Sequence, residues 1–412
     1  MTEERIELEV LKPADAADVP GDLAELIGAD AAARVIALRR DLHRHPEIGM
    51  DTVRTAERVE EGLRALGAED VRRFAKTGVA GVIRGSKPGP MIGLRADMDA
   101  LPIPEESGAP YASECPGKAH LCGHDGHVAG LFAAAEWLAQ HKESFAGSVC
   151  LIFQPGEEGF SGAARMIEDG LFDAFPCREV FAIHGEPGLP VGQIKVRAGA
   201  MTASADLAYY TVEGKGGHGA RPHQTIDPVP AAAELILAMQ TIVSRNVDPT
   251  DSAVLSMCWL SAGDVNATTV IPQRVRLSSV ARAFSPEVRD LIERRVREVC
   301  AGIGMATGTK ITVDYTRLYP PQINDAALFE AVRPALEREL GAENVVTNFK
   351  PVMISEDFAF MSEKMPSVYI QLGLDGKTPS PALHSPQFNF SEAALGVWTR
   401  VMAAIVKDRL PA

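Results

Sequence analysis

The stretch His120-Leu121-Cys122-Gly123-His124-Asp125-Gly126-His127 gathers histidine, cysteine and aspartate side chains in one short run. The apolar residues 128–138 that follow it predict a buried helix, and Asp125 stands where it would cap the start of that helix. The positive end of a helix favours the thiolate form of a nearby cysteine, which is the form that binds metal. Taken alone, the stretch fits a capped helix as well as it fits a metal site.

Four apolar runs elsewhere in the chain predict strands that end close to residues of the same chemical kind. They are residues 91–95 before Asp97 and Asp99, residues 148–154 before Glu157 and Glu158, residues 180–183 ending at His184, and residues 367–373 ahead of the loop with His384. In open α/β sheets, binding sites form where strands end at the carboxyl edge. We therefore expect these segments to converge with residues 120–127 on a metal site.

Composition indicates a soluble cytoplasmic protein. The 412 residues carry a formal net charge of −14 and have a pI near 5.3, which argues against nucleic acid or an anionic membrane as the main partner. The first residues lack the basic and then apolar pattern of a signal peptide, and no apolar run approaches the length of a membrane span. The six cysteines are scattered and show no disulfide framework.

The periodicity of apolar residues divides the chain into parts. Residues 31–202 alternate helical patterns with short strands, which predicts an α/β catalytic domain whose mixed, mostly parallel sheet has helices on both faces. Residues 203–317 show the order β-α-β-β-α-β of a ferredoxin-like α+β unit. This unit interrupts the first domain, which resumes over residues 318–412, and residues 1–30 form an N-terminal extension.

Short motifs run along most of the chain. They are Asp41-Leu-His-Arg-His-Pro-Glu47, Leu94-Arg-Ala-Asp-Met-Asp-Ala-Leu-Pro102, Cys122-Gly-His-Asp-Gly-His127, Gln154-Pro-Gly-Glu-Glu-Gly159, Gly214-Lys-Gly-Gly-His-Gly-Ala220, Val270-Ile-Pro272, Ser355-Glu-Asp-Phe358 and Leu383-His-Ser385. In identity, order and spacing they resemble the M20 family of metallopeptidases and amidohydrolases, in its aminoacylase and hippurate hydrolase-like branch. Thr269 departs from the family, which usually has Asn before Val-Ile-Pro, and this puts an inter-subunit or substrate contact in question.

The resemblance implies a catalytic domain with an inserted lid that also serves in dimerisation. It further implies metal-dependent hydrolysis of the amide bond of N-acyl amino acids, with Glu157 as general base and acid. Matching residue to motif gives the metal ligands Cys122, His124, Glu158, His184 and His384. These side chains are more than one four-coordinate ion needs, so we expect two divalent ions, drawn from Zn²⁺, Mn²⁺, Co²⁺ and Ni²⁺, with the thiolate between them.

Other residues are expected to support the ligands or hold the substrate. Asp97 replaces a histidine of related enzymes, so Asp97, Asp99 and His127 are predicted to orient the ligands and not to bind metal themselves. We interpret His43 and His45 as packing beneath the site. In the lid, the resemblance implies that His218 reaches the active site of the other subunit and hydrogen-bonds the developing oxyanion there. Arg282 is a candidate for binding the substrate carboxylate, and Asn266 for a cross-dimer contact. We expect a homodimer or a dimer of dimers.

Four alternatives remain open at the level of sequence. The same site also suits a dipeptidase or a hydrolase of aromatic amides. A thiol hydrolase would use Cys122 as nucleophile and His124 as base, but it leaves Glu158, His184 and His384 without a role. A non-catalytic binding protein on this scaffold would have no need of Glu157.

Overall fold

The structure, a computed structural model, describes residues 11–412, which form two compact units. The first unit comprises the described residues up to Gly199, together with Ile323–Lys350 and Phe360–Ala412. The second comprises Ala200–Gln322 and Pro351–Ala359. The sequence assigned residues 203–317 to the insertion. The second unit extends further because its last strand pairs as far as Tyr319, and it also takes in a short segment of the chain's third part.

The first unit is built on an eight-stranded sheet. Its strands, in spatial order, are β1 (Glu69–Phe74), β2 (Gly78–Arg84), β4 (Ala146–Gln154), β3 (Lys87–Asp97), β5 (Val180–Pro190), β16 (Ser367–Asp375), β6 (Ile194–Lys195) and β15 (Val345–Val346). The four central strands, β4, β3, β5 and β16, are mutually parallel, whereas β2 pairs antiparallel with β4. The predicted mixed, mostly parallel sheet is confirmed.

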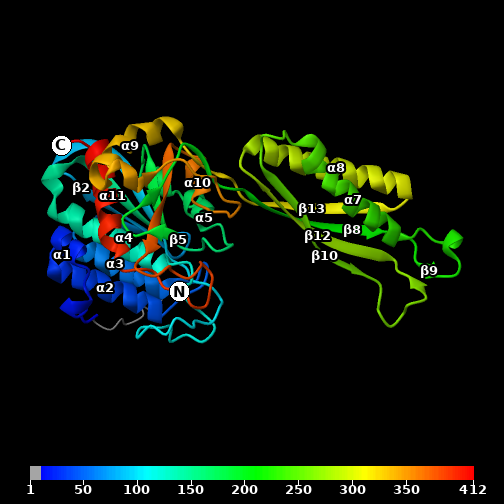
Figure 1. Ribbon diagram of the computed structural model, residues 1–412, viewed down its shortest axis with the longest axis horizontal. Coiled ribbons are helices and arrows are strands. Elements are labelled where there is room, and N and C mark those ends of the chain that lie inside the picture. Colours follow the sequence, from blue (N-terminus) through cyan, green and yellow to red (C-terminus); the bar gives the residue numbers. More distant parts are fainter. Residues whose placement is uncertain (1–10) are drawn as a thin grey trace. The chain divides into compact units, whose positions relative to one another are not determined.

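Helices cover both faces of this sheet (Figure 1). They are α1 (Gly21–Ile27), α2 (Ala29–Arg44), α3 (Val53–Ala65), α4 (His124–Gln140), α5 (Gly162–Glu168), α6 (Leu171–Ala174), α9 (Ala326–Leu340) and α11 (Ala394–Arg409). Gly78 and Gly81 face opposite sides of β2: a Cβ added at Gly78 would meet Met166 of α5, and one added at Gly81 would meet Leu63 of α3. Because both faces are covered, β4 and β16 are buried almost throughout.

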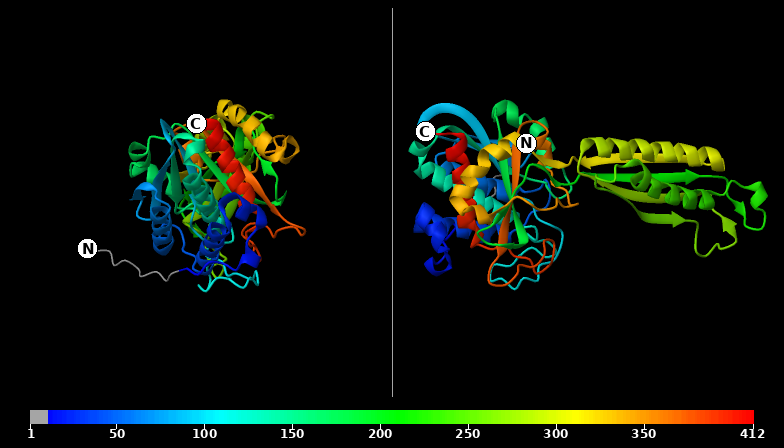
Figure 2. Two further views of the ribbon diagram at one scale, coloured as in Figure 1. Left: turned by 90° about the vertical axis from the view of Figure 1, so that its left-hand side faces the viewer. Right: turned by 45° about the horizontal axis from the view of Figure 1, so that its top comes forward.

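Helix α4 carries the start of the predicted metal site, and α11 fixes its position. Figure 2 shows α11, in red, beside α4. A Cβ on Gly130 of α4 would lie 2.5 Å from the indole of Trp398, which is fully buried on α11. Only glycine therefore allows this close approach of the two helices.

The second unit has the ferredoxin-like order that the sequence predicted. Its elements are β8 (Ala205–Glu213), α7 (Pro228–Asn246), β10 (Ala253–Ala262), β12 (Arg274–Ala283), α8 (Pro286–Thr307) and β13 (Lys310–Tyr319), with the short strands β9 (Gly217–His218) and β11 (Val270–Ile271). The sheet order is β10-β12-β8-β13, with all neighbours antiparallel. Both helices pack on one face of the sheet (Figures 1 and 2). Asp227 and Ser285 cap them by accepting from the backbone N–H groups of Val229 and Val288.

Three short elements lie where the chain passes from one unit to the other, namely β7 (Gly199–Thr202), β14 (Gln322–Asn324) and α10 (Ala359–Ser362). Of the predicted N-terminal extension, residues 1–10 lie outside the described residues, and α1 packs against α2 and α11. Across residues 11–412, none of the helices has both the length and the apolar composition that crossing a bilayer requires.

Candidate metal centre

The start of α4 differs from the sequence prediction. The helix begins at His124, and its N-cap is Gly123, whose φ of 90° lies in the left-handed region that favours glycine. The prediction that Asp125 caps the helix is wrong. Asp125 lies inside the first turn, fully buried, and its carboxylate contacts Arg39 and His43 at 2.8 Å each. The Asp125 carboxylate thus pairs with the buried side chains of Arg39 and His43 and not with the N–H groups of the helix backbone.

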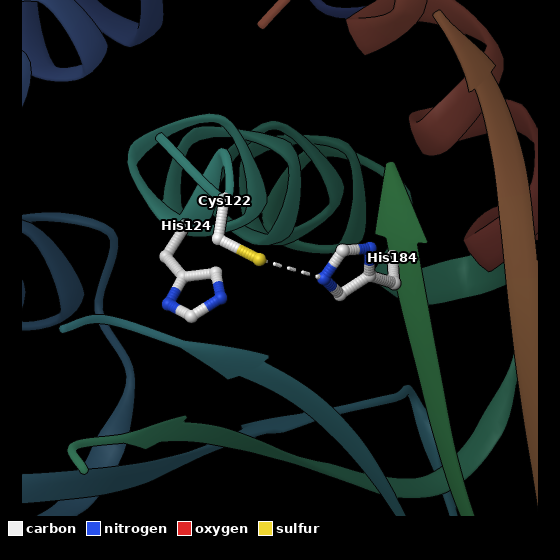
Figure 3. A group of neighbouring side chains, drawn as sticks. All are labelled: Cys122, His124 and His184. Carbon is white, nitrogen blue, oxygen red and sulfur yellow. Dashed lines mark hydrogen bonds between the residues drawn. The ribbon is translucent and has the colours of Figure 1, made fainter. Parts of the chain in front are cut away.

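Three predicted ligands meet between the start of α4 and strand β5. Cys122 Sγ lies 3.4 Å from His184 Nε2, with the ring of His124 beside them (Figure 3). The three ligand atoms lie within 4.8 Å of one another, and all three residues are buried. His184 was expected at the end of its strand, but β5 continues to Pro190 and places His184 in mid-strand, level with Gln371 of β16.

A second group shares the same cysteine. Cys122, Glu158 and His384 also offer ligand atoms within 4.8 Å of one another, and His384 Nε2 lies 3.2 Å from Glu158 Oε1. His124 forms a further group with Glu157 and Glu158. The structure therefore brings all five predicted ligands and Glu157 together, with Cys122 common to two of the groups.

The ionisation of the Cys122 thiol depends on whether a cation is bound. Burial raises the pKa of the thiol well above its usual value, and the neighbouring carboxylates of Glu158, Glu157 and Asp97 raise it further. Without a cation, burial and these carboxylates both favour the protonated thiol. A cation among them would reverse this balance and stabilise the thiolate.

His124 is oriented for a ligand role. Its Nδ1–H donates to the carbonyl oxygen of Asp99 at 2.8 Å. Its Nε2 is buried and has no hydrogen-bond partner among the described residues. Burial opposes the charged form, but Asp97 and Asp99 raise the pKa of His124 to about 10. A buried nitrogen with no partner, next to a thiol and carboxylates, is what a site built for a cation provides.

Asp99 holds the turn that carries the two glutamates. Its Oδ1 accepts from the N–H of Glu157 at 2.9 Å, and its Oδ2 accepts from the N–H of Glu158 at 3.1 Å. Its own carbonyl orients His124, as described above. One residue just beyond the end of β3 therefore positions three groups of the centre, which is what its predicted supporting role requires.

His127 and Asp97 form a layer behind the ligands. The N–H of Gly185 donates to His127 Nε2 at 3.0 Å, so the ring proton lies on Nδ1 and is donated to Asp97 Oδ1 at 2.6 Å. The other carboxylate oxygen of Asp97 accepts from Arg95 at 2.8 Å. Both nitrogens of His127 are thus committed to protein groups. Asp97, His124 and His127 also offer ligand atoms within 4.8 Å of one another, so the supporting roles of Asp97 and His127 stay a prediction.

His384 comes from a strained turn. Its φ is 63°, a left-handed value that is uncommon for a residue with a Cβ, and its side chain is half exposed. Its N–H donates to the carbonyl of Leu121 at 2.8 Å, which ties this loop to the segment that carries Cys122. Strain of this kind persists where the surroundings fix a functional side chain.

Sequence reasoning missed a buried network behind α4. Arg39 and His43 of α2 are fully buried and bind Asp125, and His43 also contacts Glu105 at 3.0 Å. The interpretation of His43 as simple packing is wrong, because both of its ring nitrogens bind carboxylates. The spacing of Arg39 and His43, one helical turn apart on an otherwise apolar face, was the available signal.

Three predicted substrate residues belong to the second unit. His218 is exposed on β9, and its Nδ1 accepts from the N–H of Ala220 at 3.1 Å. Asn266 is exposed in the loop before β11, and Thr269 there accepts from the N–H of Gly219 at 2.7 Å. Arg282 is half-buried on β12, and within residues 11–412 its buried Nη1 has no hydrogen-bond partner.

A thiol, imidazoles and carboxylates gathered beside the parallel strands of an α/β sheet form the kind of centre that a metal-dependent hydrolase uses. The sequence profile of the peptidase family M20/M25/M40 matches residues 93–408. The chain belongs to this family, which confirms the resemblance drawn from its motifs.

Relatives extend the similarity over nearly the whole chain. Hippurate hydrolase from Campylobacter jejuni is 38% identical over 358 residues, covering 87% of this chain and 92% of its own length. N-acetyl-L-cysteine deacetylase from Bacillus subtilis is 38% identical over 362 residues, covering 88% and 85%. A solved Bacillus subtilis structure, described as a dinuclear metal-binding peptidase of family M20, has a TM-score of 0.79 at 32% identity and covers 92% of this chain and 98% of its own.

Proposed function

We propose that the protein is a metal-dependent amidohydrolase. It cleaves the amide bond of N-acyl amino acids and releases a carboxylic acid and a free amino acid. The observation that carries the proposal is the meeting of Cys122, His124, Glu158, His184 and His384, with one cysteine common to two groups of ligand atoms. The relatives named above support the substrate class, because hippurate and N-acetylcysteine are both N-acyl amino acids.

Two divalent cations fit these side chains. The residues that would hold them are the five just named, with the Cys122 sulfur shared. The buried Nε2 of His124 has no hydrogen-bond partner among residues 11–412, and a cation would take the place of its proton. The related dinuclear peptidase supports the number of ions. When bound, such ions polarise the substrate carbonyl and lower the pKa of water. Mixed sulfur, nitrogen and oxygen ligands suit Zn²⁺, Mn²⁺, Co²⁺ or Ni²⁺.

Glu157 is the residue to which we assign proton transfer. It is buried, it offers a carboxylate oxygen within 4.8 Å of ligand atoms of His124 and Glu158, and Asp99 fixes its backbone. In the proposed reaction its carboxylate takes a proton from the attacking water and delivers it to the nitrogen of the leaving amino acid. A carboxylate held at this place needs no movement of the backbone between the two transfers.

We assign substrate recognition to the second unit. Arg282 has a buried guanidinium nitrogen without a partner in the described part of the chain, and a substrate carboxylate would pair with it. His218 would hydrogen-bond the developing oxyanion, and Asn266 would make a cross-dimer contact. These roles require a homodimer, or a dimer of dimers, in which one subunit's His218 serves its partner's site. A cytoplasmic location remains part of the proposal.

The thiol hydrolase is the less favoured alternative. Burial and adjacent carboxylates raise the pKa of Cys122, which opposes the thiolate that a nucleophilic cysteine needs. A dipeptidase and a hydrolase of aromatic amides use the same centre and differ only in substrate.

A hydrolysis screen tests the proposal. Protein reconstituted separately with each of the four metals is offered hippurate, N-acetyl amino acids and dipeptides, and free amino acid is measured. We expect chelation to abolish hydrolysis and added metal to restore it. Hydrolysis that survives chelation but is lost on alkylation would establish the thiol enzyme, whereas tight binding without any cleavage would establish the binding protein.

A further inference from the structure

His43 lies at the centre of a buried chain of charged groups. The residue is fully buried on α2, its Nδ1 lies 2.8 Å from Asp125 Oδ2, and its Nε2 lies 3.0 Å from Glu105 Oε1. Ionised carboxylates can only accept hydrogen bonds. The His43 ring can therefore donate to both of them only when each of its nitrogens carries a proton. Burial opposes that charge, but Asp125 and Glu105 outweigh it and raise the pKa of His43.

The positive charge belongs to His43 and not to its neighbour. His120 stacks on His43 with ring centroids 6.4 Å apart, and burial lowers the pKa of His120 to about 3. Arg39 contributes a second cation, which also contacts Asp125. Arg39 also pairs with Glu392 at 3.2 Å. His43, Arg39 and Asp125 are buried, where hydrogen bonds between charged partners are strong.

One end of this chain reaches the first half of the metal centre. Asp125 follows His124 directly in the first turn of α4. With its Oδ2 held by both His43 and Arg39, the carboxylate anchors the turn from which His124 projects. His43 is thus connected to the proposed ligand His124 by one hydrogen bond, to the neighbouring residue Asp125.

The other end reaches the second half. Glu105 accepts from the N–H of Ser113 at 2.6 Å and from the hydroxyl of Ser107, which fixes the loop around it. The next residue, Glu106, donates its N–H to the carbonyl of Pro386 at 2.7 Å. Pro386 lies two residues beyond His384, which is half exposed and strained. The segment that carries His384 is therefore connected to the His43 imidazole through Glu105, Glu106 and Pro386.

We propose that His43 is a positioning residue that sets the spacing between the two halves of the metal centre, the half on α4 with His124 and the half in the loop with His384. This inference rests on the proposed function, because it assigns metals to both halves. It does not place His43 in contact with substrate or metal.

Two substitutions of His43 separate its hydrogen bond to Asp125 from its hydrogen bond to Glu105. The amide nitrogen of His43→Asn takes the place of Nδ1, so this variant keeps the donor to Asp125 and loses the donor to Glu105. The amide nitrogen of His43→Gln takes the place of Nε2 and does the reverse. His45→Gln is the matched control, because His45 is one-third exposed just beyond the end of the same helix and its Nδ1 contacts Asp41, not Asp125 or Glu105.

Metal affinity and hydrogen–deuterium exchange are the measurements. In His43→Asn we expect one of two bound metals to weaken by about 10–100-fold, with faster exchange over residues 102–119 and 383–390. In His43→Gln we expect the faster exchange at residues 122–127. At saturating metal, kcat should fall in both variants while KM stays within about twofold, because His43 does not contact substrate. His45→Gln should behave as wild type in every respect.

The outcomes distinguish this inference from the proposed function. Exchange is measured first on metal-free protein, so the two links are tested even if the wild type binds no metal or cleaves no amide. If either variant fails to fold, Glu105→Gln, which keeps an acceptor but loses the charge, should reproduce the pattern of His43→Asn more weakly. Wild-type metal affinity together with unchanged exchange in the folded variants would overturn the inference, and so would uniform loosening of the whole unit.

Discussion

At the scale of single residues, Glu157 separates proton transfer from metal binding. Glu157→Gln keeps the size and hydrogen bonding of the side chain but removes its basicity, while Asp99 still holds the backbone. We expect metal content to stay at the wild-type level and kcat to fall by roughly two to four orders of magnitude. Metal analysis and steady-state kinetics on the same sample check this. A variant that loses its metal, or retains its rate, would show that the roles of Glu157 and Glu158 are exchanged.

A second residue, Asp41, gives a pH dependence of stability. Burial opposes ionisation of its carboxyl, but Arg54 at 2.7 Å and Arg58 at 3.2 Å outweigh burial and lower its pKa. A lowered folded pKa gives stability that is present above the unfolded pKa of about 3.9 and is lost as pH falls through the folded pKa. Asp41→Asn should therefore lower Tm at neutral pH, and its difference from wild type should shrink below about pH 4.

Thermal scans at one heating rate, from pH 3 to pH 7, measure this difference. Asp51→Asn is the control, because Asp51 pairs with Lys76 on the exposed surface and such pairs contribute little. A Tm difference for Asp41→Asn that stays constant across this range would show that the pKa of Asp41 is the same in the folded and unfolded chain.

At the scale of elements, the packing of α4 against α11 positions the centre. An alanine at a helical glycine normally stabilises a helix by up to about 1 kcal/mol. At Gly130 the added Cβ would lie 2.5 Å from Trp398, so we expect Gly130→Ala to destabilise the fold by about 1–3 kcal/mol. Gly302→Ala, on α8 where nothing lies within 4 Å, should instead stabilise slightly. Thermal unfolding of both variants compares the two signs, and stabilisation by both would mean that the helices are not closely packed at Gly130.

Elements with one strong local pattern were predictable from sequence. The apolar stripe of α8 with its Ser285 cap, and the alternating burial along β12, are set by neighbours in the chain, and the predicted order of elements over residues 203–317 is found. The start of α4 was not predictable, because Asp125 chooses between the helix backbone and the cations Arg39 and His43, which come from α2. The length of β5 beyond His184 likewise depends on pairing with β16, a distant segment.

In the site, too, local motifs were predictive and contacts between distant segments were not. Motif matching indicated Cys122, His124, Glu158, His184 and His384, and the structure brings them together. The raised pKa of the metal-free Cys122 thiol was not predictable, because it depends on carboxylates from two other segments, which no local pattern around the cysteine reveals.

At the scale of the whole molecule, the proposed exchange of His218 between subunits can be tested by complementation. His218→Ala and Glu157→Gln should each be nearly inactive. In a mixed dimer, one site combines an intact Glu157 with the partner subunit's intact His218, so random mixing should recover up to about a quarter of wild-type activity. Rates measured before and after subunit mixing check this. No recovery after proven mixing would confine His218 to its own subunit or remove it from catalysis.

The most direct test of the central claim is the number and position of bound metals. Anomalous X-ray scattering from crystals of metal-loaded protein should show two peaks about 3.5–4 Å apart, with Cys122 Sγ beside both and His184 and His384 beside one each. Cys122→Ser crystals, prepared alike, should lose occupancy at both positions. A single peak, peaks away from these side chains, or full occupancy in Cys122→Ser would contradict the account.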